Sequence, residues 1–89
     1  ILDHCSEGWC REFVRATPDK RFAPGEWAEH VSGVPIFRDA LASVICEVDQ
    51  AEPFGSHYVI RGLVQDVAVR EPHEGLIYLD GRYARPAFL

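Results

Sequence analysis

The sequence predicts one small, mainly β domain that begins with a short helix. Three observations support this. Residues 4–16 carry apolar side chains at helical spacing, residues 18–37 form a connector interrupted by Pro and Gly, and strand-forming residues dominate from residue 40 onward. A length of 89 residues suits a single domain with a modest core.

The predicted helix over residues 4–16 is amphipathic. Four of its residues fall on one face of a 3.6-residue period: Trp9, Cys10, Phe13 and Val14. Asp3 or Ser6 is expected to cap its start. Thr17 is expected to end it, because the residue before a proline avoids the helical conformation.

The connector over residues 18–37 is unusually aromatic. It contains Phe22, Trp27 and Phe37, and one helical turn is expected over Glu26–His30. A loop with this composition is expected to pack onto the rest of the domain; lining a ligand cleft is the alternative.

The second half of the chain predicts antiparallel strands. Leu41–Asp49 and Tyr58–Val69 are rich in Val, Ile and Ala, and Ala51–Ser56 is expected to be the hairpin loop between them. Apolar residues at both parities of Tyr58–Val69 predict burial on both faces over part of its length. A third strand is expected at Leu76–Leu79 and a tight turn at Asp80-Gly81, followed by a final segment, Tyr83–Leu89.

Three or four strands are too few to close a barrel. The sheet is therefore expected to be completed by sequence outside these residues or by a partner chain. The first residue is Ile1 and the chain contains no Met, which suggests a part of a longer polypeptide.

Charge and hydropathy exclude several classes of function. Nine Lys and Arg against 14 Asp and Glu give a net charge of −5, which argues against nucleic-acid binding. No apolar run approaches the roughly 20 residues that span a bilayer, so no membrane segment or signal peptide is expected.

The cysteines predict neither disulfides nor a metal site. Cys5, Cys10 and Cys46 are odd in number, which favours reduced thiols in a cytoplasmic protein. Cys46 lies in a strand-like run and is expected to be buried. Cys5 and Cys10 lack the spacing and the second pair of a metal site; recruitment of His4 and His30 as further ligands is the alternative, and the metal-free interpretation is favoured. His4, His30 and His73 are interpreted as structural or exposed, and Glu71–Glu74 as a polar hairpin loop.

The order and spacing of several short motifs resemble a known family. They are Gly33-Val34-Pro35, Ala40-Leu41-Ala42, Cys46-Glu47-Val48, Gly55-Ser56-His57, Gly62-Leu63-Val64, Leu76-Ile77-Tyr78 and Gly81-Arg82-Tyr83. This series is similar to the C-terminal half of the flavin reductases, which are FMN-binding split-barrel proteins. Gly62 lies five residues after His57, as the family pattern requires. Ser56 departs from the pattern, which has an acidic residue there.

The resemblance implies a fold, a reaction and cofactors. Residues 1–89 would be the C-terminal portion of one split-barrel domain whose N-terminal half, which holds most of the flavin, is absent. The parent protein would be an NAD(P)H:flavin oxidoreductase that binds FMN or FAD and takes hydride from NAD(P)H. It would be a cytoplasmic homodimer that supplies reduced flavin to a monooxygenase component.

The resemblance also suggests site residues. His57 would position the nicotinamide dinucleotide, beside Gly55 and Ser56, and Tyr83 would line the same cleft. Basic and aromatic residues near phosphate or flavin complete the set: Lys20, Arg21, Phe22 and Arg82. Without the family pattern, His57 is an ordinary surface histidine at a strand start.

Two other classes of function remain open. One is a non-catalytic flavin-binding or structural β module. The absence of an acidic residue before His57 favours it. The other is a small acidic subunit that adds strands to the sheet of another chain.

Overall fold

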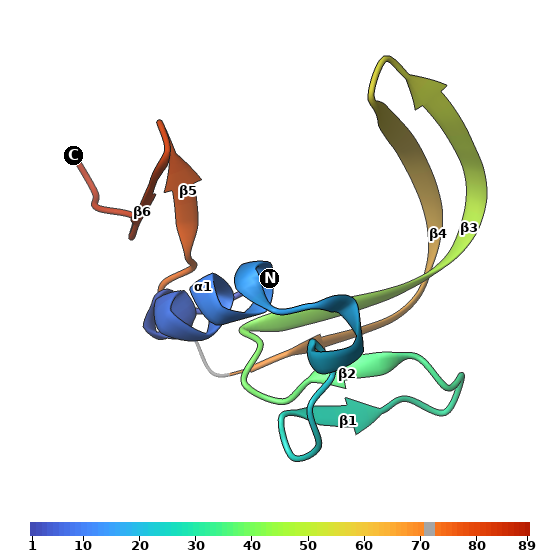
Figure 1. Cartoon of the computed structure of the whole chain (residues 1–89), viewed down its shortest axis with the longest axis horizontal. Coiled ribbons are helices and arrows are strands. Elements are labelled where there is room, and N and C mark those ends of the chain that lie inside the picture. Colours follow the sequence, from blue (N-terminus) through green and yellow to red (C-terminus); the bar gives the residue numbers. More distant parts are fainter. Residues whose placement is uncertain (71–72) are drawn as a thin grey trace.

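The computed structural model describes residues 1–70 and 73–89 and has three antiparallel hairpins next to one helix (Figure 1). The elements in chain order are the 3-10 turn η1 (His4–Ser6), α1 (Glu7–Arg15), the 3-10 turn η2 (Pro18–Lys20), β1 (Trp27–Glu29), β2 (Pro35–Phe37), β3 (Ala42–Phe54), β4 (His57–Val69), β5 (Ile77–Leu79) and β6 (Arg82–Ala84). The mainly β class with a short N-terminal helix is therefore confirmed. The number of strands is larger than the three or four that were expected.

The N-terminal helix forms where the apolar period predicts it. Asp3 caps η1 by accepting the Cys5 backbone N–H at 2.8 Å, whereas Ser6, at the start of α1, makes no side-chain cap bond. At the other end, Arg21 Nε donates to the carbonyls of Phe13 (3.1 Å) and Ala16 (3.2 Å). These bonds satisfy carbonyls that the end of a helix leaves without partners.

The connector packs as an aromatic core, which confirms its structural interpretation. Trp9 of α1 stacks on Phe37 of β2 with ring centroids 3.9 Å apart, and Trp27 packs against Phe22 at 4.7 Å. Phe37 is 9% exposed and is the only buried apolar side chain in the described part of the chain. Trp9 Nε1 also donates to Glu26 Oε2 at 3.0 Å, which ties the helix to the connector.

The helical turn expected over Glu26–His30 is wrong. Trp27–Glu29 forms β1, which pairs with β2 so that Trp27 lies opposite Phe37. Backbone bonds from His30 N to the Val34 carbonyl and from Gly33 N to the His30 carbonyl close this hairpin, and Gly33 has a φ of 86°. The cross-strand aromatic pair and the left-handed glycine outweigh a weak local helix preference.

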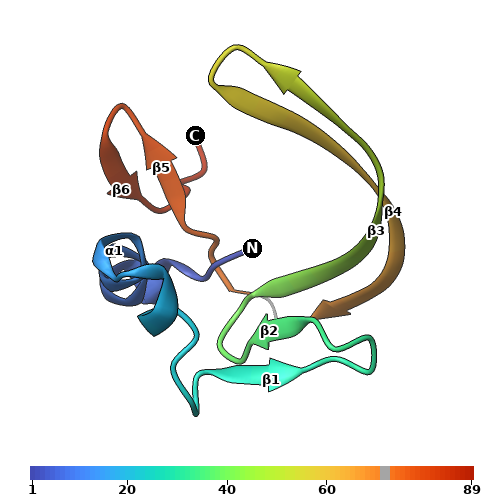
Figure 2. The same ribbon diagram turned by 45° about the vertical axis from the view of Figure 1, so that its right-hand side comes forward.

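The long hairpin β3–β4 dominates the second half of the chain and curves away from the β1–β2 hairpin (Figure 2). The loop expected at Ala51–Ser56 is wrong, because β3 continues to Phe54 and only Gly55 and Ser56 form the turn. Gly55 has a φ of 58°, which allows a two-residue connection and keeps the preceding residues in register with β4.

The predictions that Tyr58–Val69 is buried on both faces and that Cys46 is buried are wrong for the chain by itself. Every residue of β4 is exposed, including Leu63 (55%) and Val67 (53%), and Cys46 is exposed as well. The backbone ladder holds the two strands together, but the described residues do not cover their apolar side chains. All three cysteines are free, as predicted.

The third hairpin follows the sequence prediction closely. β5 and β6 pair through the Asp80-Gly81 turn, in which both residues have positive φ values of 52° and 73°. This combination is that of a type I′ turn. Strand β6 ends at Ala84, so only the start of the predicted final segment, Tyr83–Leu89, pairs with β5.

Polar contacts join these parts. Asp3, which is 2% exposed, accepts from Arg70 Nη2 at 2.6 Å and forms a bridge with Gly75. His30 Nε2 meets Asp66 Oδ2 at 2.9 Å, which links the β1–β2 hairpin to β4. Of the loop predicted at Glu71–Glu74, Glu71 and Pro72 lie outside the described residues. None of the described helices is long and apolar enough to cross a membrane.

Phe37→Ala tests the aromatic core. The substitution removes the ring on which Trp9 stacks, so we expect the free energy of unfolding to fall by about 3 kcal/mol. Chemical denaturation followed by tryptophan fluorescence measures this loss. Phe88→Ala is the matched control, because Phe88 is fully exposed and its truncation should change stability by less than about 0.5 kcal/mol.

Gly62→Ala tests the close approach of β3 and β4. A Cβ on Gly62 would lie 2.8 Å from Cys46 Cβ, so the two strands would have to shift. We expect a loss of about 1–3 kcal/mol in the free energy of unfolding, as in overpacked sites. Gly8→Ala is the control, because no atom lies within 4 Å of that position and alanine favours the helix. Equal stability of the two variants would contradict the prediction.

Candidate functional site

The residues suggested for the site lie in three different parts of the fold. Gly55, Ser56 and His57 form the tip of the β3–β4 hairpin, Arg82 and Tyr83 lie on β6, and residues 20–22 follow α1. The β3–β4 and β5–β6 hairpins extend to the same side of the β1–β2 hairpin (Figures 1 and 2). Of residues 20–22, Phe22 packs instead in the aromatic core and Arg21 bonds the end of α1.

The hairpin tip presents free polar groups. His57 Nδ1 lies 2.9 Å from Ser56 Oγ, and both residues are exposed together with Gly55. The Ser56 hydroxyl therefore orients the imidazole ring and leaves Nε2 directed to other partners. A histidine held in this way can donate a hydrogen bond to a phosphate or a carboxamide.

Tyr83 lies in an open groove between α1 and the β5–β6 hairpin. Its hydroxyl is 3.3 Å from Cys10 Sγ, and the Arg11 guanidinium lies 4.7 Å from the ring centroid. The hydrogen bond with Cys10, together with desolvation, raises the pKa of Tyr83 above its usual value. The phenol therefore stays protonated and can donate or accept a hydrogen bond at neutral pH.

The groove measures about 530 Å³ and has a basic and aromatic lining. Its lining residues are Cys10, Arg11, Val14, Arg15, Tyr78, Gly81 and Tyr83. A volume of this size lies within the range of small-molecule sites. Guanidinium groups beside phenol rings are suited to ligands that combine a planar ring with a negative charge.

The groove contains residues that the sequence analysis did not single out. Arg11 and Arg15 are four residues apart on α1 and therefore lie on one side of the helix. This spacing was available from the sequence. What could not be read from it is that β5–β6 brings Tyr83 next to Cys10, because the two residues are 73 positions apart.

Arg21 and Phe22 serve the fold in this structure. The Arg21 guanidinium is bonded to carbonyls at the end of α1, and Phe22 packs against Trp27 and Phe13. Lys20 is exposed. Within the described residues, no contact joins Arg21 or Lys20 to His57 or Tyr83.

A chain of hydrogen bonds that the sequence did not predict joins Ser32, His30 and Asp66. Ser32 Oγ lies 2.8 Å from His30 Nδ1, and His30 Nε2 lies 2.9 Å from Asp66. Ser32 N also donates to the same Nδ1 atom at 3.2 Å. Since the serine and histidine belong to one tight turn, we interpret this set as a clasp between the hairpins.

Comparison with known proteins gives this geometry a context. Residues of the chain are 40% identical over 72 positions to FMN reductase (NADH) RutF of Variovorax paradoxus, covering 80% of this chain and 40% of that protein. They are 31% identical over 86 positions to the 4-hydroxyphenylacetate 3-monooxygenase reductase component of Klebsiella oxytoca, covering 93% and 51%. The chain thus spans about half the length of the curated relatives it matches.

Solved structures agree with the sequence relatives. A flavin reductase domain protein from Arthrobacter sp. FB24 superposes with a TM-score of 0.87 at 25% identity, over 100% of this chain and 55% of that one. The resemblance drawn from the motif series is therefore confirmed. Because the family model described as "Flavin reductase like domain" matches residues 1–87, the chain belongs to the flavin reductase like domain family.

Proposed function

We propose that this chain is part of an NAD(P)H:flavin oxidoreductase that reduces FMN or FAD. The match of the family model to residues 1–87 is the observation that carries this proposal. The relatives named FMN reductase (NADH) and monooxygenase reductase component support it further. The basic and aromatic groove at Tyr83 is chemically compatible with nucleotide cofactors.

We further propose that residues 1–89 form the C-terminal portion of a single flavin reductase-like domain. The exposed apolar side chains of β3 and β4 support this, because a sheet face of this kind is normally covered. The 55% coverage of the Arthrobacter structure also supports it. The other portion would then cover the long hairpin and provide most of the flavin contacts.

The described residues fit part of a flavin and dinucleotide site. His57 and Ser56 offer exposed hydrogen-bonding groups, and the groove that contains Tyr83 is also lined by Arg15 and by Arg11, whose guanidinium is paired with Glu7 at 2.8 Å. We propose that His57 and Tyr83 orient the nicotinamide dinucleotide, with Gly55 and Arg82 nearby in sequence. Lys20, Arg21 and Phe22 remain proposed flavin contacts, of which Arg21 would first have to leave the α1 carbonyls.

The cofactors carry the chemistry in this proposal. A bound flavin accepts a hydride, and hence two electrons, from the reduced nicotinamide. In this proposal His57 and Tyr83 would hold and orient the dinucleotide for that transfer.

The proposal extends to assembly. We propose that the parent protein is a cytoplasmic homodimer that passes reduced flavin to a monooxygenase component; the relatives named as reductase components support the monooxygenase partner. A non-catalytic flavin-binding module is the second candidate function. Ser56 favours it, because the acidic residue of the family triplet is replaced there.

The test is to measure flavin binding and NAD(P)H oxidation with the same purified protein. We expect quenching of FMN or FAD fluorescence on binding and flavin-dependent loss of NAD(P)H absorbance. In His57→Ala, the loss of a hydrogen bond to a charged group should raise the KM for the dinucleotide about 10-fold while flavin affinity is retained.

The matched control is His30→Gln, which changes a histidine outside the proposed site and should leave both constants unchanged. Flavin binding without NAD(P)H oxidation would favour the non-catalytic module. An unchanged KM in His57→Ala would remove the proposed role of His57 but not the reductase activity itself.

A further inference from the structure

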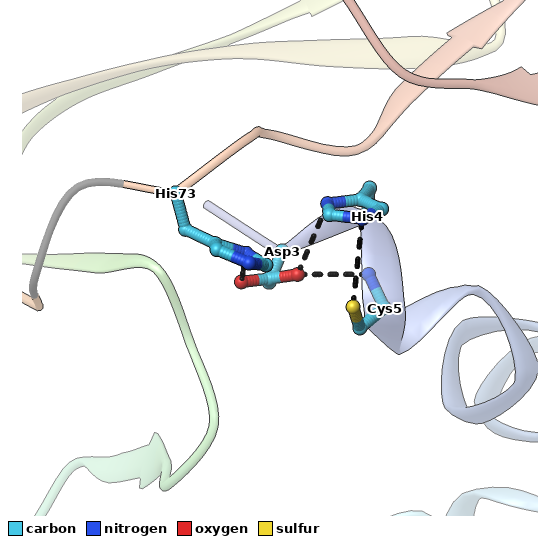
Figure 3. A group of neighbouring side chains, drawn as sticks. All are labelled: Asp3, His4, Cys5 and His73. Carbon is cyan, nitrogen blue, oxygen red and sulfur yellow. Dashed lines mark hydrogen bonds and ion pairs between the residues drawn. The ribbon is translucent and has the colours of Figure 1, made fainter.

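Four potential metal ligands converge where the N-terminal segment meets the segment after β4. Asp3, His4 and Cys5 are consecutive, and His73 reaches them from the other end of the chain (Figure 3). One ligand atom from each lies within 4.8 Å of the others. Asp3 lies between His73 on one side and His4 and Cys5 on the other.

We propose that Asp3, His4, Cys5 and His73 form a structural binding site for Zn²⁺. Thiolate, imidazole and carboxylate are the three ligand types that zinc takes in proteins, and four protein ligands make a closed, structural site. The site joins residues that lie far apart in the sequence, so a bound ion would fasten the N-terminal segment to the β5–β6 half of the chain.

The geometry of His4 and Cys5 fits a tetrahedral ion. Cys5 Sγ lies 3.5 Å from His4 Nε2. Zinc bonds of about 2.3 Å to sulfur and about 2.05 Å to nitrogen at a tetrahedral angle place these atoms about 3.6 Å apart. The pair is therefore already at ligand spacing, and the widest pair in the cluster has to close by roughly 1–1.5 Å on the same geometry.

The second ring nitrogen of His4 has the kind of partner that a ligand histidine requires. His4 Nδ1 lies 3.2 Å from the backbone carbonyl of Glu74, so the donated proton sits on Nδ1 and Nε2 keeps its lone pair. His73 Nδ1 lies against the carboxylate of Asp3, so these two groups meet as neighbouring ligands, and a bound ion would take the place of the proton between them while the His73 proton moves to Nε2. The two rings stack with centroids 4.8 Å apart, which holds both near the Asp3 carboxylate.

The charges around the cluster allow the ion. Asp3 is 2% exposed, and its carboxylate accepts a hydrogen bond from the backbone N–H of Cys5 at 2.8 Å. Arg70 Nη2 contacts one oxygen of Asp3 at 2.6 Å, and this side chain, which is 43% exposed, would turn toward water when the ion binds. Binding replaces the Cys5 thiol proton with a zinc–sulfur bond and releases that proton, so thiolate and carboxylate together balance the two charges of the ion.

Sequence spacing alone does not reveal this site. The ligands His4 and Cys5 are adjacent in sequence and 68 or more residues from His73, which matches no short metal motif. The two segments come together in the fold through the bridge between Asp3 and Gly75 and through the backbone bond from His4 N to the Glu74 carbonyl.

The test uses purified protein from which metal has been removed with a chelator. Zn²⁺ is titrated by calorimetry, and Co²⁺ is used as a spectroscopic probe. We expect one ion per chain, tetrahedral cobalt bands and a thiolate-to-cobalt charge-transfer band. Cys5→Ser should abolish the charge-transfer band. Both Cys5→Ser and His73→Gln should weaken Zn²⁺ binding by about 100-fold or more, since loss of even an outer-shell partner costs 10–100-fold.

Cys46→Ser and His30→Gln are the matched controls and should retain the ion and the spectrum. Circular dichroism verifies that each variant is folded, and both Cys5 and His73 are exposed enough to be replaced without opening a core. Absence of stoichiometric binding, equal affinity of His73→Gln and the parent protein, or a cobalt spectrum without thiolate character would overturn the proposal. These readouts do not depend on flavin reduction.

Discussion

The stack of Trp9 on Phe37 is the contact on which the arrangement of this chain depends. The rings lie 3.9 Å apart, and Phe37 is the buried apolar side chain of the described residues. Through this pair α1 is fixed on the β1–β2 hairpin, and Trp27 and Phe22 complete the aromatic packing. The position of α1 in turn places Cys10 and Arg11 against Tyr83, so the groove is built on the same contact.

The long β3–β4 hairpin is held together in a different way. Its strands are 13 residues long and pair along 12 residues each, yet the side chains of β4 remain exposed. Backbone hydrogen bonds therefore determine its register. The described residues do not cover its apolar faces. This explains why the tip with Ser56 and His57 stands apart from the aromatic core. It also agrees with a chain that spans about half the length of its relatives.

Polar contacts between distant segments supply the remaining order. Asp3 bonds Arg70 and His73, and His30 bonds Asp66, so each contact joins an early segment to β4 or to the residues after it. Both contacts involve histidines that the sequence pattern could only describe as structural or exposed. A histidine has the same appearance in a sequence whether it lies at a surface, in a clasp or beside potential metal ligands.

Local patterns in the sequence determined the elements that depend on neighbouring residues: the amphipathic helix around Trp9 and Phe13, the Asp80-Gly81 turn and the Gly55-Ser56-His57 triplet. Tertiary structure decided what depends on distant partners. The pairing of Trp27 with Phe37 makes a strand, β1, where a helical turn was expected. The strand pairing of β3 with β4 continues to the pair Phe54–His57, where a longer loop was expected. The contacts of Cys10 with Tyr83 and of Asp3 with His73 also belong to this second group. The physical reason is that periodicity and turn chemistry act over a few residues, whereas side chains about 70 positions apart meet only after the hairpins have packed.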